Sequence, residues 1–239
     1  MTRRAPPAVA AVLLCAFLLI PVVALVVEAR LRSLPDLLGD PVVRDALWVT
    51  LKTNLAAQAL ILGLGTPAAW LLARHRFRGR AAVITLTELP LFLPPAVAGI
   101  ALLAAYARGG LFGETLERAG VLLPFGPWAV VIAITFVAMP YYLRQAIAAF
   151  EALDDDLLDV ARTLGASPAR VFWRVALPLA AGGLTAGWVL ALARGLGEFG
   201  ATIIFAGNVQ GRTSTLTLTI YQQLETRRDG ALALGVLML

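Results

Sequence analysis

Long apolar segments separated by short charged loops run along the whole 239-residue chain. A membrane-spanning helix needs about 20 predominantly apolar residues, and five segments reach that length. A sixth begins near Gly230 and ends at Leu239, which is too short to cross a bilayer, so we expect the chain to be a fragment or a truncated product. The predicted spans are residues 7–27, 47–72, 82–106, 128–150 and 177–205, with the incomplete segment 230–239.

The apolar segments are continuous runs rather than alternating apolar and polar positions, which predicts helices and excludes a transmembrane β-barrel. The composition agrees, because 59% of the residues are hydrophobic and 15% are charged, whereas a soluble domain carries about 25% charged residues. The segment 7–27 is longer than the apolar core of a cleaved signal peptide, which has about 7–15 residues. We therefore predict an all-α, polytopic membrane helical bundle of about six transmembrane helices, with an uncleaved first span.

Positive charges gather in the loop 74–80 and in the segment 151–178. Under the positive-inside rule this places both segments, and the N-terminus, in the cytoplasm. The net charge of +5 comes from these loops and is explained by orientation in the membrane. We therefore expect no nucleic-acid partner. One cysteine and one histidine are too few for a disulfide framework or a shared metal site. With no catalytic constellation or phosphate-binding loop visible, we expect neither catalytic nor metal-binding residues.

The polar segment 151–178 has a helix-turn-helix pattern of its own. Apolar residues recur in it at three- and four-residue spacing, which predicts an amphipathic helix; they are Leu157, Val160, Ala161 and Leu164. Gly165 is expected to end this helix as a C-terminal cap. Ser167 and Pro168 are typical of the start of a second helix.

Both ends of the same segment can be interpreted from their residues. Asp154, Asp155 and Asp156 indicate a solvated helix start, because acidic residues suit the first turn. Consecutive residues on a helix point in different directions, which argues against a metal site there. Leu177 and Pro178 are expected to close the unit where the next apolar run begins.

Glycines in the predicted fifth span suit close helix packing. The residues 195–200 match the pattern G-x-G-x-x-G, but that pattern indicates dinucleotide binding only within a βαβ unit. In a helical chain it predicts close backbone approach or local unwinding. Gly183 and Gly187 form a G-x-x-x-G pair that indicates packing against another helix. The third span is expected to break in its middle at its prolines, Pro90, Pro94 and Pro95.

Arg194 and Glu198 lie four residues apart and share a helix face. Counted from Pro178, Glu198 lies about 30 Å along the helix, near the external interface. Ionisable residues within spans are candidate functional residues. We interpret these two as a structural ion pair, and the alternative is that they bind a substrate.

The segment 151–178 resembles the cytoplasmic signature of ABC importer permease subunits, EAA-x3-G-x9-I-x-LP. Aligned on Gly165, the final leucine and proline match, while the triplet departs from the signature by a shorter acid and a valine. The resemblance implies a type I importer permease whose coupling segment docks on an ATPase. The coupling motif carried over by the alignment is Asp159, Val160, Ala161, Gly165, Val175, Leu177 and Pro178.

A second resemblance concerns the substrate. The stretch GLGEFGATIIFAGNVQGRTSTLTLTIY at 195–221 is similar to molybdate-type permeases, and implies molybdate or tungstate, with sulfate or thiosulfate as the alternative. The residues that match this family signature are Gly197, Glu198, Phe199, Gly200, Ala206, Gly207 and Asn208.

The resemblance also implies the partners and the organisation of the chain. It predicts a homodimer of permease subunits in the lipid of the bacterial inner membrane, with two cytoplasmic ATPase subunits and an external (periplasmic) oxyanion-binding protein. ATP and Mg²⁺ would be used by the ATPase, and this chain would bind no cofactor. Residues 1–44 would form an N-terminal helix and external loop, and residues 45–239 the permease domain.

Two other functions compete with this interpretation. An ion-coupled secondary transporter or channel would need buried carboxylates for proton or sodium coupling, and the candidates are Glu88 and Glu198. A membrane-embedded enzyme is disfavoured because no catalytic constellation is visible.

Overall fold

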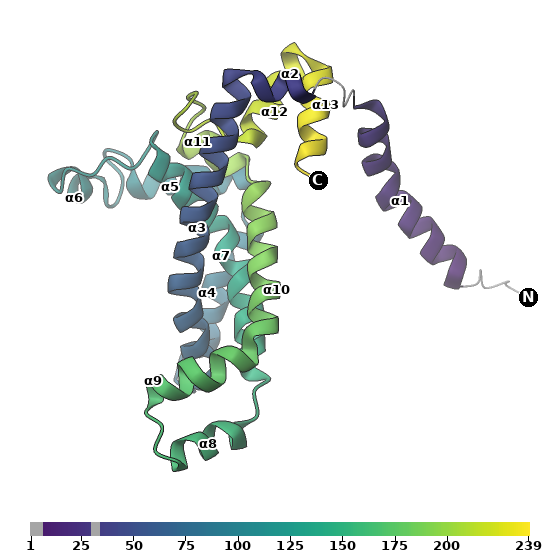
Figure 1. The fold of residues 1–239 in the computed structure, drawn as a ribbon. Coiled ribbons are helices and arrows are strands. Elements are labelled where there is room, and N and C mark those ends of the chain that lie inside the picture. Colours follow the sequence, from purple (N-terminus) through teal and green to yellow (C-terminus); the bar gives the residue numbers. More distant parts are fainter. Residues whose placement is uncertain (1–6, 30–33) are drawn as a thin grey trace, which may run out of the picture.

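The computed structural model describes residues 7–29 and 34–239, and this part of the chain is built of helices and turns without a β-strand (Figure 1). Four of its helices are long and apolar enough to cross a membrane, or five if one bent pair counts as a single span. The prediction of an all-α membrane bundle is therefore confirmed. The N-terminal residues 1–6, which we predict to be cytoplasmic, lie outside the described residues.

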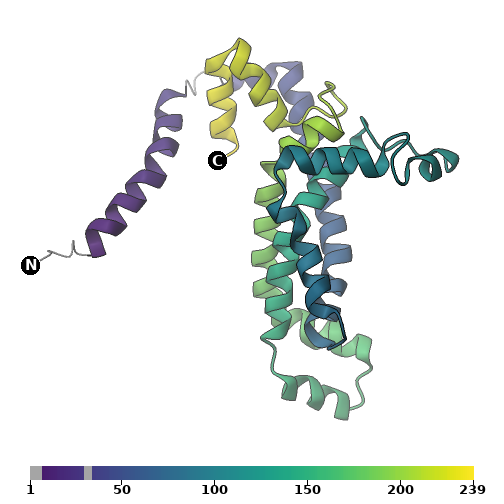
Figure 2. The same cartoon turned by 180° about the vertical axis from the view of Figure 1, so that it is seen from behind.

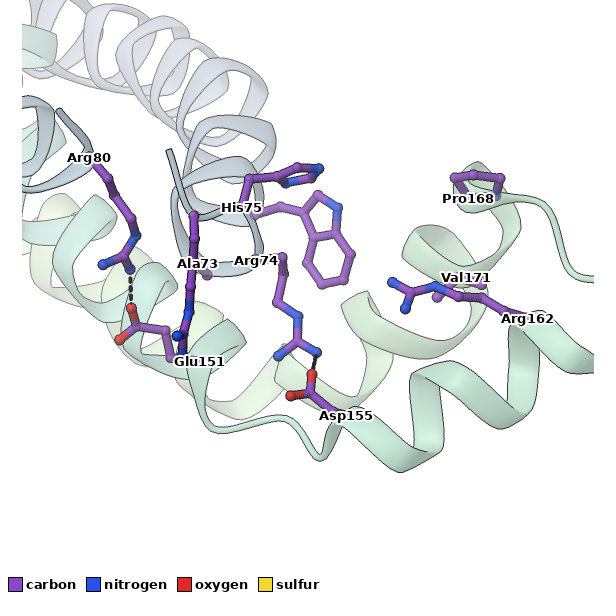
Figure 3. Close-up of a pocket in the computed structure, with 11 residues that line it drawn as sticks. Ala73, Arg74, His75, Arg80, Glu151, Asp155, Arg162, Pro168 and Val171 are labelled. Atoms are coloured by element: carbon purple, nitrogen blue, oxygen red, sulfur yellow. Dashed lines mark hydrogen bonds and ion pairs between the residues drawn. The ribbon is translucent and has the colours of Figure 1, made fainter. Parts of the chain in front are cut away.

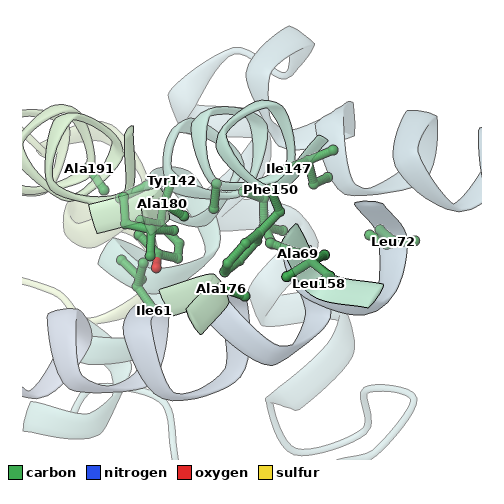
Figure 4. Close-up of a cluster of buried hydrophobic side chains, with 14 of the residues drawn as sticks. Ile61, Ala69, Leu72, Tyr142, Ile147, Phe150, Leu158, Ala176, Ala180 and Ala191 are labelled. Atoms are coloured by element: carbon green, nitrogen blue, oxygen red, sulfur yellow. The ribbon is translucent and has the colours of Figure 1, made fainter. Parts of the chain in front are cut away.

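Three long helices form the centre of the bundle: α3 (Pro41–Arg74), α7 (Pro127–Glu151) and α10 (Leu177–Leu196). They run side by side in both ribbon views (Figures 1 and 2). Their contact surfaces bury Ile61, Tyr142 and Ala191 (Figure 4). The Tyr142 hydroxyl lies 2.6 Å from the Thr66 hydroxyl, so this buried polar group has a hydrogen-bond partner inside the bundle.

Glycines of α10 allow it to approach α7 closely, as the G-x-x-x-G pair predicts. A Cβ atom added at Gly183 would lie 2.5 Å from the Cβ of Ala149, and one added at Gly187 would lie 2.8 Å from the Cβ of Gln145. Both distances are shorter than van der Waals contact. The packing role of these glycines is therefore confirmed.

We predict that Gly183→Leu will destabilise the bundle by about 1–3 kcal/mol, because a side chain inserted into a well-packed contact forces α10 away from α7. The matched control is Gly182→Leu, since a Cβ at Gly182 meets nothing within 4 Å. Thermal unfolding of the purified protein in detergent, followed by circular dichroism, measures the difference. Equal midpoints for the two variants would contradict the packing argument.

The third predicted span is broken, as its prolines predict. It consists of α4 (Arg80–Phe92) and α5 (Pro95–Tyr106), which meet at an angle of 116°. The break lies at Leu93 and Pro94, whereas Pro90 lies inside α4. Figure 2 shows α4 in front of the bundle and α5 crossing above it, toward the short helix α6 (Gly113–Arg118).

The predicted fifth span, residues 177–205, starts where α10 starts, but its predicted end is wrong. At the start, α9 (Pro168–Val171) continues through a π turn at Phe172–Ala176 into α10, so one helical segment runs from Pro168 to Leu196. Leu177 and Pro178 are the first residues of α10 and follow the π turn directly, so the predicted unit ends where the fifth span begins. At the other end, the chain unwinds after Leu196 and resumes as α11 (Gly200–Phe205).

The end of the bundle opposite α8 and α9 carries three further helices, α2 (Leu34–Gly39), α12 (Leu216–Thr226) and α13 (Arg228–Leu237). Helices α12 and α13 pack with α3 around Val43, Leu216 and Leu234, and α2 contacts α3 and α13. The incomplete sixth segment of the sequence lies in α13. Helix α1 (Pro7–Glu28) stands apart from the bundle (Figure 1) and packs mainly against α13, with its apolar side chains exposed.

Candidate functional site

Two short helices, α8 (Asp155–Thr163) and α9, project from one end of the bundle (Figure 1). Asp154 caps α8 by accepting a hydrogen bond of 2.9 Å from the Asp156 N–H. Gly165 follows the helix with a φ of +82°, a left-handed conformation that glycine adopts without steric cost. Ser167 caps α9 by accepting a hydrogen bond from the Arg170 N–H. The helix-turn-helix pattern and the solvated acidic start are thus confirmed.

The apolar face predicted for α8 does not face the bundle. The one buried side chain of α8 is Leu158, whereas the predicted face is mostly exposed, at Leu157, Val160 and Leu164. The reason is that α8 lies beyond the end of the bundle, so only the side carrying Leu158 reaches the core. The opposite apolar side is left without a partner in the described chain, which is typical of a protein interaction surface.

An aromatic cluster holds α9 and the π turn against the bundle. The ring of Trp70 in α3 lies 5.2 Å from the ring of Phe150 in α7 and 5.5 Å from that of Phe172 in the π turn. These centroid distances are within the range of favourable aromatic pairs. The buried side chains of Val171 and Ala176 pack into the same core. Helices α3, α7 and α9 are therefore joined by one packed contact.

Arg74 adds polar contacts at the same place (Figure 3). Its guanidinium lies 5.8 Å from the centre of the Trp70 ring and forms an ion pair with Asp155. It also donates hydrogen bonds to the carbonyl oxygens of Phe150 and Leu153, at 3.5 and 3.4 Å. One side chain from the end of α3 thereby contacts the end of α7 and the start of α8.

A cavity of about 640 Å³ lies between these elements, lined by Arg74, Arg80 and Arg162 together with Glu151 and Asp155 (Figure 3). Arg80 pairs with Glu151 across it. Within the residues that the structure describes, no group of three His, Cys, Asp or Glu side chains could hold a metal ion.

The structure places all seven residues of the predicted coupling motif in this unit. Asp159 and Val160 are exposed on α8, and Asp159 pairs with Arg162 at 2.6 Å. Ala161, Val175 and Leu177 are half-buried against the core. The remaining two occupy special backbone positions: Gly165 the left-handed turn, and Pro178 the first turn of α10.

Sequence reasoning missed Trp70 and Arg74, which join the unit to α3. The available signal was an arginine four residues after a tryptophan at the end of a span, a spacing that brings two side chains together on a helix. The sequence predicts Phe150 only as the last residue of a span, whereas its ring is fully buried at this contact.

A second polar contact lies at the far end of α10. Arg194 and Glu198 form an ion pair of 2.7 Å, in which the Glu198 side chain is 1% exposed. The Glu198 carboxylate also accepts a hydrogen bond of 2.7 Å from the Ala201 N–H at the start of α11. The Glu198 carbonyl oxygen accepts one of 2.8 Å from the Thr217 hydroxyl in α12. Glu198 therefore connects three helices where the chain is unwound.

The other signature residues surround this unwound segment. A Cβ at Gly200 would lie 2.5 Å from the Cβ of Pro95, and one at Gly195 would lie 2.9 Å from Asn54 Oδ1. The glycine pattern at 195–200 thus provides close approach and unwinding, as predicted. The rest of the signature lies at or just beyond the break. Gly197 follows the last residue of α10, and the Phe199 ring lies 5.0 Å from the Tyr221 ring at a tilted angle. Ala206 is buried, Gly207 has a φ of +71° and Asn208 contacts Gln222.

Comparisons with known proteins cover both the projecting helices α8 and α9 and the unwound segment around Glu198. Residues 65–239 match the family model described as "Binding-protein-dependent transport system inner membrane component". The chain is 45% identical over 232 residues to the molybdenum transport system permease protein ModB of Mycobacterium tuberculosis, covering 97% of this chain and 87% of that protein. It is 35% identical over 217 residues to the sulfate transport system permease protein CysW of a Synechocystis species, covering 90% and 79%.

The fold has a counterpart among solved structures. A bacterial ABC transporter involved in the import of the acidic polysaccharide alginate superposes with a TM-score of 0.65, at 16% sequence identity, covering 97% of this chain and 90% of that one. At this identity the likeness concerns the fold alone, and it supports the type I importer architecture.

Proposed function

Because this chain belongs to the family of binding-protein-dependent transport system inner membrane components, we propose that it is the transmembrane permease subunit of an ATP-driven importer that carries molybdate, or tungstate, inward across the cytoplasmic membrane. The observation that carries the proposal is the 45% identity to a molybdenum permease over nearly the whole chain. The multi-pass bundle and its projecting helix pair agree with it.

The partner that fits the exposed face of α8 is a separate ATPase subunit. ATP and Mg²⁺ bind to that subunit in this proposal, and the permease binds neither. The chain works as a homodimer with two ATPase subunits and an external oxyanion-binding protein. The apolar residues Leu157, Val160 and Leu164 lose their exposure to water when the ATPase covers them.

The contacts around α8 and α9 support a route by which movement of the proposed ATPase subunit would reach the membrane. A displacement of α8 is transmitted through Asp155 and Arg74 to α3. A displacement of α9 and the π turn is transmitted through the Phe172 ring to Trp70 of α3 and Phe150 of α7. Because α9 continues into α10, α10 moves with it. All three central helices therefore respond to the same displacement, which suits a change of access between the two sides of the membrane.

The orientation follows from the same assignment. If the ATPase covers α8, the end of the bundle with α8 and α9 is cytoplasmic, and the end with α11, α12 and α13 is external. We propose that the N-terminus is cytoplasmic, in agreement with the positive-inside rule.

An ion-coupled transporter is disfavoured by the placement of its candidate carboxylates. Glu198 is buried against Arg194 at 2.7 Å, and Glu88 faces Arg144 at 4.0 Å. Each glutamate thus has an arginine as its neighbour, so neither is the unpaired carboxylate that ion coupling would need. Sulfate transport is the second candidate, because of the 35% identity to a sulfate permease.

Uptake measurements in proteoliposomes test the proposal. The permease is reconstituted with a candidate ATPase subunit and loaded binding protein, and we predict uptake of radiolabelled molybdate that requires ATP. Excess tungstate is expected to suppress this uptake more strongly than excess sulfate. Stronger competition by sulfate would identify a sulfate permease. Uptake driven by an ion gradient without the ATPase would refute the importer assignment.

A further inference from the structure

A groove of about 340 Å³ lies between α4 and α7 and is lined by two ion pairs. In one pair α4 supplies the arginine, and in the other α4 supplies the glutamate. Near α8, Arg80 of α4 pairs with Glu151 of α7. Further into the bundle, Glu88 of α4 faces Arg144 of α7. The transmission of movement described above uses neither Glu88 nor Arg144, so this second pair needs its own explanation.

Arg144 is the more accessible member of its pair. Its side chain is 73% exposed, against 29% for Glu88, and its Nε lies 4.0 Å from Glu88 Oε1, which is beyond hydrogen-bond distance. In the described part of the chain, no hydrogen bond reaches its guanidinium. The pair formed by Arg194 and Glu198 is by contrast closed and buried. The guanidinium of Arg144 is therefore available to another anion.

The depth of Arg144 indicates what it faces. It precedes Glu151, the last residue of α7, by seven positions, or about 10 Å along the helix. A charged side chain exposed to hydrocarbon at such a depth is costly, so arginines within spans face the protein interior or a water-filled space. Arg144 is exposed within the protomer, so this principle favours a groove that opens toward water over one that opens toward lipid.

Helix α4 gives a second indication of a water-filled space. None of its side chains is buried in the described protomer, and the chain leaves the helix at Leu93 and Pro94 before α5 begins. Non-helical backbone at membrane depth is tolerated where it is covered by protein or lines an aqueous cavity. The loosely covered α4 and the charged groove beside it fit one wall of such a cavity.

Building on the proposed function, we propose that Arg144 binds the translocated tetrahedral oxyanion within the membrane. Its guanidinium presents planar, charged N–H donors that match the oxygens of a tetrahedral dianion. Glu88 pairs with the guanidinium when the anion is absent and competes with the anion when it arrives. The contact therefore stays weak, which passage of the anion requires.

A lipid phosphate offers the same oxygen chemistry as the transported oxyanion. An arginine about 10 Å from the end of its helix can extend its stem toward the headgroups. The experiments below separate these two sources, because a lipid-bound arginine faces hydrocarbon whereas a substrate-bound one faces water.

The first experiment compares the two partners of the pair. In the reconstituted complex with saturating loaded binding protein, Arg144→Gln is expected to lower molybdate uptake about tenfold or more, because a charge-assisted hydrogen bond is lost, while ATP hydrolysis continues. Glu88→Gln leaves the cation in place and removes the carboxylate that competes with the anion, so release of the anion is slowed and uptake is expected to fall, but by less than in Arg144→Gln. Arg118→Gln, which opens an exposed pair with Glu114 outside the spans, is the control.

The outcomes of this experiment are distinct. If Glu88→Gln and Arg144→Gln lower uptake and ATP hydrolysis to the same extent, the pair merely joins α4 to α7 and the proposal is overturned. If Arg144→Gln transports like the wild type, it is overturned as well. A wild-type complex that does not transport molybdate would instead contradict the proposed function.

The second experiment measures access to the groove. Cys15, the one cysteine of the chain, is replaced by alanine, and Ala148→Cys is introduced in the groove one turn from Arg144. We expect this thiol to react with a charged methanethiosulfonate and molybdate to slow the reaction, except when Arg144→Gln is also present. Phe17→Cys on the apolar α1 is expected not to react. No reaction at position 148, as for a lipid-facing wall, or a rate unaffected by molybdate would overturn the proposal.

Discussion

The variant Glu198→Ala is expected to lower the free energy of unfolding by about 3 kcal/mol, because removing one partner of a buried ion pair leaves the other uncompensated. The effect is at the low end of the usual range since Arg194 keeps 24% of its surface exposed. Part of the loss comes from the Ala201 N–H, which loses its hydrogen-bond acceptor at the start of α11. Denaturant unfolding in detergent micelles, followed by circular dichroism, measures this value.

Two further variants separate the contribution of the Glu198 charge from that of its hydrogen bond to the Ala201 N–H. Glu198→Gln keeps an oxygen acceptor for the Ala201 N–H and removes only the charge, so its loss is expected to be smaller. Replacing Arg194 and Glu198 together by leucine removes the uncompensated charge and is expected to recover part of the stability. If the double variant were less stable than Glu198→Ala, the pair would not be the source of the effect.

The variant Gly165→Val is expected to reduce ATP-driven uptake about tenfold while the permease still inserts into the membrane. A left-handed conformation costs an L-residue roughly 1–2 kcal/mol, and a β-branched side chain is a particular outlier there. The turn after α8 relaxes to avoid this cost, which redirects the exposed face that the ATPase covers. A free-energy change of about 1.4 kcal/mol corresponds to the tenfold loss.

Gly165→Asn is the matched control, since asparagine visits the left-handed region routinely. No neighbouring atom lies within 4 Å of a Cβ built at Gly165, so both side chains fit and only the backbone preference differs. Copurification of the ATPase with each variant, together with the amount of permease in the membrane, distinguishes lost docking from lost insertion. Equal docking by the valine and asparagine variants would contradict this role for the turn.

Local signals in the sequence predicted the features that depend on a few neighbouring residues. Gly165 after an amphipathic run and Ser167 before Pro168 define the turn between α8 and α9, because caps and left-handed positions have strong residue preferences. The glycine spacing at Gly183 and Gly187 predicted a close helix contact for the same kind of reason. The break at Pro94 follows from the missing N–H of proline.

Features that depend on tertiary contacts could not be predicted from local sequence patterns. The apolar spacing at Leu157 and Leu164 predicts a helix, but it does not specify whether the face contacts this chain or another protein. The contact of Trp70 with Phe150 joins positions 80 residues apart, which no local pattern reveals. The break after Leu196 depends on the Glu198 carboxylate reaching the Ala201 N–H, whereas hydrophobicity alone predicts one uninterrupted span.

The π turn at Phe172–Ala176 constrains the number of residues that this part of the chain can contain. Each residue of an α-helix rotates the chain by about 100°, and a π turn holds a further residue in one turn. The side chains of α10 are therefore rotated relative to those of α9. With this offset Gly183 faces α7 while Trp173 remains exposed. Inserting or deleting one residue here would misalign one of these two surfaces, whereas point substitutions leave the helical phase intact.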